Sequence, residues 1–126
     1  MAKNKFKELS SQDKKIIKVF TELGMPRNLA KTLMYISGVE ECRSAEIERN
    51  ANLRQPEVSV AIQELQRRGW VSKRDLKKKG KGRPVHLYTL NSNINSIVKD
   101  FEDHKQKEIN LIKKDLSELK NLIDQR

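Results

Sequence analysis

The sequence predicts a mainly α-helical domain with one small β-hairpin, followed by a long C-terminal helix. Three observations lead to this fold class. Apolar residues recur every three or four positions in four segments before residue 70. Between residues 70 and 90 the apolar period changes to about two, which is typical of strands. From residue 92 onward the helical spacing returns and continues almost to the last residue.

Length and composition restrict the class of protein further. The 126 residues include 27 Lys or Arg and 17 Asp or Glu, for a formal net charge of +10. A hydrophobic content of 36% is enough for one folded domain. No apolar run is long enough to span a membrane, and residues 1–15 lack a secretory signal, so we expect a cytoplasmic protein with no membrane partner. Cys42 is the only cysteine, which excludes an intrachain disulfide framework.

The first two helices should follow a basic arm at residues 1–10. Ser10 or Ser11 is expected to cap the first helix and Gly24 to end it. Its apolar positions at helical spacing are Ile16, Val19, Phe20 and Leu23. Pro26 suits the first turn of the second helix, and Gly38 closes that helix. The apolar face of the second helix is Leu29, Ala30, Leu33, Met34 and Ile36.

A third and a fourth helix are predicted on either side of a short turn. Ser44 should cap the third helix, and residues 52–54 should form the turn. Pro56 should start the fourth helix, where its missing N–H costs least, and Gly69 should end it. The buried face of the fourth helix is Val58, Ala61, Ile62 and Leu65.

A basic β-hairpin comes next. Residues 70–74 and 85–90 should be its strands, and Trp70 is most simply a core residue. Residues 67–83 hold nine basic side chains and one acidic side chain, Asp75. Residues 1–91 hold 20 basic and 10 acidic residues, whereas residues 92–126 hold seven of each. A patch of this kind favours a polyanionic partner, although a solubilising surface loop would have the same composition.

This order of elements is a helix-turn-helix followed by a wing. A protruding fourth helix, at about residues 55–68, fits the DNA major groove, and the wing at 75–85 can reach adjacent backbone or the minor groove. Glutamine can pair with adenine, and arginine with guanine or phosphate. Val60 is either a thymine-methyl contact or an isolated surface apolar residue. The positions opposite or beside the buried face are Gln55, Pro56, Ser59, Val60, Gln63 and Arg67.

Two segments resemble a known group of regulators. Residues 47–71, IERNANLRQPEVSVAIQELQRRGWV, resemble the helix-turn-helix of MarR-, ArsR- and TrmB-type winged-helix regulators, and residues 82–88, GRPVHLY, resemble their wing. The resemblance covers residues 11–91 and implies a dimeric transcriptional regulator of double-stranded DNA. It implies operator or backbone contacts by Arg54, Gln55, Pro56, Ser59, Gln63 and Arg83. Charge adds four wing lysines to the predicted DNA-binding set: Lys77, Lys78, Lys79 and Lys81.

The chain departs from these types in ways that bear on its ligand. Longer TrmB-type regulators carry a C-terminal sugar-binding domain, and we expect none here because only about 35 residues follow the winged helix. Cys42, His86 and His104 lack the spacing of metal ligands, so we expect no metal or cofactor; a site shared across a dimer stays open. Cys42 beside Arg43 is either a redox-sensitive thiol or a small residue at a helix edge. The effector, the operator and the sign of regulation are left open.

Residues 92–126 should form a dimerisation helix. The predicted contact positions are Val98, Phe101, Ile109, Ile112, Leu116, Leu119 and Ile123. A helix of about 35 residues is roughly 50 Å long, too long to hide this apolar stripe against an 80-residue domain. Pairing with a second copy would solve this, while folding back on the first helix is the alternative.

Other functional classes fit the sequence less well. The glycines at 80 and 82 lie between strands rather than between a strand and a helix, so they do not form a phosphate-binding loop. No spacing indicates a catalytic triad or dyad, and we expect no enzyme activity. The alternatives to a site-specific regulator are a non-specific architectural nucleic-acid binder and a winged-helix protein-interaction module of a transcription assembly.

Overall fold

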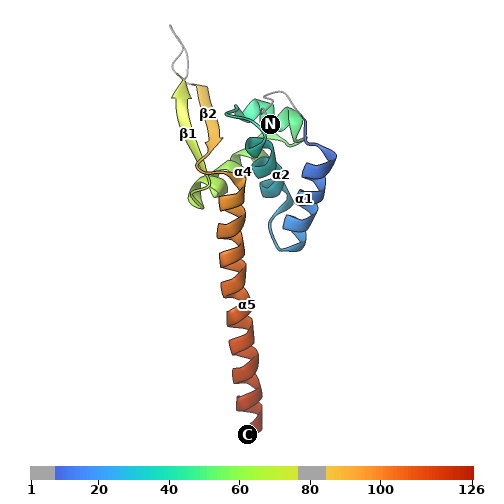
Figure 1. Ribbon diagram of the computed structural model, residues 1–126, viewed down its shortest axis with the longest axis vertical. Coiled ribbons are helices and arrows are strands. Elements are labelled where there is room, and N and C mark those ends of the chain that lie inside the picture. The colour runs from blue at the N-terminus through green and yellow to red at the C-terminus, as the bar shows by residue number, and fades with distance from the viewer. Residues whose placement is uncertain (1–7, 77–84) are drawn as a thin grey trace. The chain divides into compact units, whose positions relative to one another are not determined.

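The predicted fold class is confirmed by the computed structural model, which describes residues 8–76 and 85–126. The chain divides into two units, residues 1–93 and residues 94–126, which are described separately. The described part of the first unit consists of α1 (Ser11–Glu22), α2 (Arg27–Ser37), α3 (Ser44–Asn50), α4 (Gln55–Arg67), β1 (Val71–Leu76) and β2 (Val85–Leu90). Figure 1 shows these elements with the strands paired as a hairpin.

Helix α1 begins as the sequence predicts, but only part of its predicted apolar face is buried. The Ser10 hydroxyl accepts a hydrogen bond from the Asp13 N–H (3.0 Å), and the Asp13 carboxylate accepts one from the Ser10 N–H (3.0 Å). The buried positions are Ile17 and Phe20. Val19 is about half exposed, like Leu23, and so the apolar stripe expected from the sequence is partly wrong. Only one narrow side of α1 therefore packs against the core.

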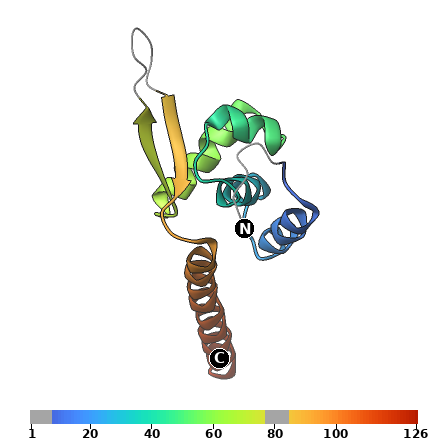
Figure 2. The same ribbon diagram turned by 45° about the horizontal axis from the view of Figure 1, so that its top comes forward.

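Helix α2 is the central element of the first unit. It contacts α1, α3, α4 and β2, and Figure 2 shows it between α1 and the helix-turn-helix. Pro26 precedes the helix instead of lying in its first turn, and the helix begins at Arg27. Thr32 is fully buried, and its hydroxyl keeps a hydrogen-bond partner because it donates to the Asn28 carbonyl (2.8 Å). The remaining buried residues of α2 are Leu29, Ala30, Leu33, Met34, Tyr35 and Ile36.

Helix α3 begins one residue earlier than predicted. Arg43 is the cap residue and Ser44 is the first helical residue, while the Glu46 carboxylate accepts the Arg43 N–H at 3.4 Å. Ile47 is fully buried, which anchors the helix to the core. The Asn50 side-chain amide donates to the Tyr35 hydroxyl (2.9 Å) and ties the end of α3 to α2.

The hairpin strands are antiparallel, with Val71 opposite Leu90 and Leu76 opposite Val85. The first strand begins one residue later and ends two residues later than predicted, and Trp70 is buried just before it. A short third segment joins the sheet, because Cys42 and Tyr88 exchange both backbone hydrogen bonds (3.0 and 2.8 Å). Residue patterns do not indicate this bridge, since residues 39–43 have no strand periodicity.

The second unit is the single helix α5 (Ile94–Asp124), of 31 residues. It begins two residues later than predicted, at Ile94. Before it, Asn91 donates its side-chain amide to the Gly69 carbonyl (2.8 Å) and its N–H to the Trp70 carbonyl (2.9 Å). Ile97 and Phe101 are its buried residues. Among the described residues, 8–76 and 85–126, no helix has the length and apolar content needed to cross a membrane.

Candidate nucleic-acid interface

The turn between α3 and α4 sets where the fourth helix begins. Asn52 has a left-handed backbone (φ 54°), a conformation that asparagine tolerates better than most residues. The Leu53 N–H donates to the Glu48 carbonyl (3.0 Å), and the Leu53 side chain is buried. Arg54, the next residue, is exposed and leads directly into α4. The turn therefore places Arg54 and the first residues of α4 at the surface.

Glu57 holds the first turn of α4 in place. Its carboxylate accepts the Arg54 N–H (2.8 Å) and the side-chain amide of Asn28 on α2 (3.1 Å). The pKa of Glu57 is lowered, mainly by the hydrogen bond from the Arg54 backbone. A charged Glu57 also complements the positive end of the helix dipole. The start of α4 is thus fixed to α2 by side-chain contacts that the sequence did not predict.

The outward side of α4 carries the positions that we expected to face DNA. Gln55, Pro56, Gln63 and Arg67 are exposed, and Ser59 is half-buried. Val60 is 67% exposed and borders a shallow hollow of about 610 Å³ that it shares with Leu29 and Pro56, among others. The buried side is Val58, Ala61, Ile62 and Leu65, as predicted. The helix therefore presents a mixed face with two exposed glutamines.

Arg67 is not an isolated cation. Its guanidinium makes two hydrogen bonds to the Glu64 carboxylate, Nε to Oε1 at 2.8 Å and Nη2 to Oε2 at 2.6 Å. Arg68 Nε donates to the same Glu64 Oε2 at 2.7 Å and its guanidinium lies 5.1 Å from the Trp70 ring centroid. These contacts lower the pKa of Glu64 to about 2, with the Arg67 hydrogen bonds the larger cause. Glu64 therefore competes with any phosphate for Arg67.

Gly69 ends α4 with a left-handed backbone (φ 78°). The Trp70 N–H donates to the Leu65 carbonyl (3.0 Å) and the Gly69 N–H to the Gln66 carbonyl (3.0 Å). This pair of bonds is a Schellman motif, which needs a residue that accepts positive φ. It turns the chain from α4 straight into β1.

Side-chain pairs link the hairpin strands to each other and to the segment before α3. Arg74 on β1 makes two hydrogen bonds to Glu41 (2.9 and 2.6 Å). Asp75 lies opposite His86 in the strand register, and His86 Nδ1 is 2.6 Å from Asp75 Oδ1. His86 is therefore an exposed residue of β2. The predicted wing contacts Lys77, Lys78, Lys79, Lys81 and Arg83 lie outside the described residues.

Cys42, His86 and His104, the residues considered above as metal ligands, lie on separate parts of the described chain. Across residues 8–76 and 85–126, no cluster of three His, Cys, Asp or Glu side chains could hold a metal ion. Cys42 is fully buried, and its backbone joins the sheet through Tyr88. Burial makes it a packed residue in this structure.

The helix-turn-helix formed by α3 and α4, followed directly by the β1–β2 hairpin, is a winged helix. A family model described as MarR family matches residues 23–82, a range that contains α2, α3, α4 and β1. The resemblance to MarR-type regulators seen in the sequence is thereby confirmed. No curated protein matches the chain.

Solved structures share this fold. A crystal structure of a MarR family transcription regulator is 15% identical, with a TM-score of 0.53 over 80% of this chain and 65% of that one. This chain therefore covers just under two thirds of that regulator. A possible transcriptional regulator from Methanosarcina mazei Go1 is 13% identical, with a TM-score of 0.51 over 76% of this chain and 85% of that one. At these identities the similarity establishes the fold.

Proposed function

We propose that this chain is a sequence-specific regulator of transcription that binds double-stranded DNA as a homodimer. In this proposal α4 lies in the major groove, and residues 75–85 contact the adjacent backbone or minor groove. The observation that carries it is the outward face of α4, where Gln55 and Gln63 are exposed on a helix whose other side is buried. The match of residues 23–82 to the MarR family supports the same function.

The amide side chains favour base reading over backbone contact alone. Glutamine presents a donor and an acceptor side by side, which matches the N6 and N7 atoms of adenine. Two such residues on the exposed face of one helix would read separate bases. The Lys and Arg residues of the wing would add phosphate contacts that raise affinity for every sequence.

The homodimer is proposed from α5. Its exposed apolar residues are concentrated between Ile109 and Ile123, and a second α5 would cover them. Of the predicted contact positions, Phe101 is only 6% exposed in the single chain, which leaves little of it for a partner to cover. Two copies related by two-fold symmetry would place two α4 helices on two half-sites.

Selection from a pool of random duplex DNA at two salt concentrations tests this function. We expect an enriched palindrome among the retained sequences, because a two-fold dimer reads two inverted half-sites. Salt-sensitive retention without enrichment would instead indicate an architectural binder that contacts phosphates only. No retention even at low salt would reject DNA binding and favour a protein-interaction module.

Replacing Lys77, Lys78 and Lys79 with glutamine separates affinity from specificity. The triple variant should weaken binding to all sequences and reduce the salt dependence, while the enriched sequence stays the same. A changed sequence preference would show that the wing reads bases.

A further inference from the structure

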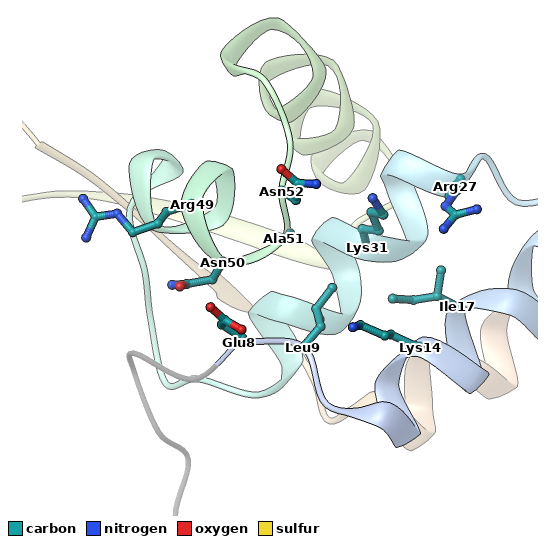
Figure 3. A pocket seen from close by; sticks show the side chains of 10 residues that line it. All are labelled: Glu8, Leu9, Lys14, Ile17, Arg27, Lys31, Arg49, Asn50, Ala51 and Asn52. Carbon is teal, nitrogen blue, oxygen red and sulfur yellow. The ribbon is translucent and has the colours of Figure 1, made fainter.

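A second basic surface lies on the first unit, and its lining residues belong to neither β1 nor β2. It is a hollow of about 460 Å³ between α1, α2 and the turn that follows α3. Figure 3 shows its lining, with Lys14 on α1, Lys31 on α2 and Asn52 in the turn. Arg27 and Arg49 lie at opposite ends of it in the same view. Side chains from three separate parts of the fold therefore meet around one concave surface.

Charge in this hollow is strongly unbalanced. Its lining contains four cationic side chains, Lys14, Arg27, Lys31 and Arg49, and one carboxylate, Glu8. Within residues 8–76 and 85–126, none of the four cations lies within 4.0 Å of a carboxylate oxygen. By contrast, Arg67, Arg68 and Arg74 are all paired with glutamates. A concave surface with unpaired charge of one sign concentrates its electrostatic field and attracts counter-ions.

The hollow is next to the start of α4. Asn52 lines it and is two residues before Arg54. The first turn of α4 is close to the same part of α2, because Glu57 accepts a hydrogen bond from Asn28 and its pKa is lowered mainly by the Arg54 backbone and further by the charge of Lys31. A ligand in this hollow would therefore border the end of α4 that we propose enters the major groove.

We propose that this hollow is an oxyanion site of phosphate chemistry, with Lys14 and Lys31 as the direct partners of the anion. Arg27 and Arg49 add to the positive potential, and Asn52 offers an amide donor at the rim. Two sources could supply the anion: a backbone phosphate of bound duplex DNA, or a free phosphate-bearing molecule. The first source rests on the proposed function, whereas the second is independent of it.

The test compares the full chain with the Lys14→Gln/Lys31→Gln variant in two assays. In the first, thermal unfolding is followed in sodium phosphate and in sodium chloride at equal ionic strength and pH. Phosphate should raise the melting temperature of the wild type by about 4 °C, and the variant should lose this shift. In the second, duplex binding is measured over a range of salt concentrations. Here the slope of log affinity against log salt should fall by about 0.9 for each phosphate that the variant no longer neutralises.

Two further variants make the outcome decisive. Lys18→Gln/Lys113→Gln removes the same charge from exposed positions of α1 and α5 and should behave as the wild type in both assays. Lys14→Arg/Lys31→Arg keeps the charge and should retain both effects, which separates anion binding from damage to the fold. Loss of the thermal shift alone assigns the site to a free anion, and loss of salt slope alone assigns it to the DNA backbone.

The proposal is overturned if Lys14→Gln/Lys31→Gln matches the Lys18→Gln/Lys113→Gln control in both assays. If the wild type binds no DNA at all, the proposed function fails, but the thermal assay still decides whether the hollow binds phosphate. The two hypotheses can therefore fail separately.

Discussion

Helices α4 and α5 are both amphipathic, yet they expose different surfaces. The 13 residues of α4 leave one large apolar side chain exposed, Val60, while the 31 residues of α5 leave eight exposed. The remaining exposed positions of α4 are mostly polar, with two glutamines and Arg67 among them. A polar outward face suits a ligand with hydrogen-bonding edges, and an apolar stripe suits a second apolar surface. This difference favours DNA reading by α4 and self-association through α5.

Leu116→Lys on α5 should have the largest effect. A lysine in the centre of the apolar stripe would leave a buried, unpaired charge in a dimer, so the chain should become monomeric. Affinity for a palindromic site should then fall about a hundredfold, because the two half-sites no longer bind together. Sedimentation equilibrium and duplex binding measure the two effects. The control is Asn121→Lys, which adds the same charge on the opposite side of α5; equal losses in both variants would refute the assignment.

Gln63→Ala on α4 should change specificity while leaving the dimer intact. Loss of a bidentate amide should reduce discrimination at one base pair of each half-site by about 1–3 kcal/mol. Binding to the selected site and to single-base variants of it measures this directly. Gln12→Ala on α1 removes the same type of side chain from an exposed position and should leave discrimination unchanged. An unaltered preference in Gln63→Ala would show that Gln63 reads no base.

Gly69→Ala tests how firmly the end of α4 is defined. A Cβ at Gly69 would meet no atom within 4 Å, so the cost comes only from the positive φ of 78°. We expect a loss of about 1 kcal/mol in the free energy of unfolding, measured by urea titration. At Gly38, which ends α2 with φ −89°, the nearest atom to a Cβ is a carbonyl oxygen at 3.6 Å. Gly38→Ala should therefore leave the free energy of unfolding nearly unchanged. An equal loss of stability in both variants would show that the positive φ of Gly69 is not the cause.

Glu64→Gln should strengthen DNA binding about threefold at low salt. It removes a carboxylate from α4 and releases Arg67 from its two hydrogen bonds, so that the guanidinium can contact a phosphate. The gain should diminish as salt is raised, because the added contact is electrostatic. Glu118→Gln, on α5, makes the same change of charge away from α4 and serves as the control. Unchanged or weaker binding by Glu64→Gln would mean that Arg67 makes no contact with DNA.

The sequence predicted the elements well where local chemistry defines them. Gly69 and the apolar spacing of residues 58–65 predicted α4 and its buried side, because both signals act within one helix. The two hydrogen bonds between Arg67 and Glu64 were not predicted, because an exposed arginine can pair with any of several nearby carboxylates. The Cys42–Tyr88 bridge was missed because it joins distant segments through backbone atoms, which leave no residue pattern. The basic hollow also escaped prediction, as its cations come from three separate parts of the fold.

The smallest expected effect is a pH dependence of stability that originates at Glu64. Hydrogen bonds from Arg67 and then Arg68 lower the folded-state pKa of Glu64 to about 2 from an ordinary value of 4.5. The stabilisation is therefore fully present above pH 4.5 and is lost progressively as the pH falls towards 2. Glu64→Gln has no proton to gain, so its difference from the wild type in free energy of unfolding should shrink over this range. Gln63→Ala changes no titratable group, so its difference from the wild type in free energy of unfolding should not vary with pH. If the difference for Glu64→Gln is also independent of pH, the hydrogen bonds from Arg67 and Arg68 to Glu64 do not form in solution.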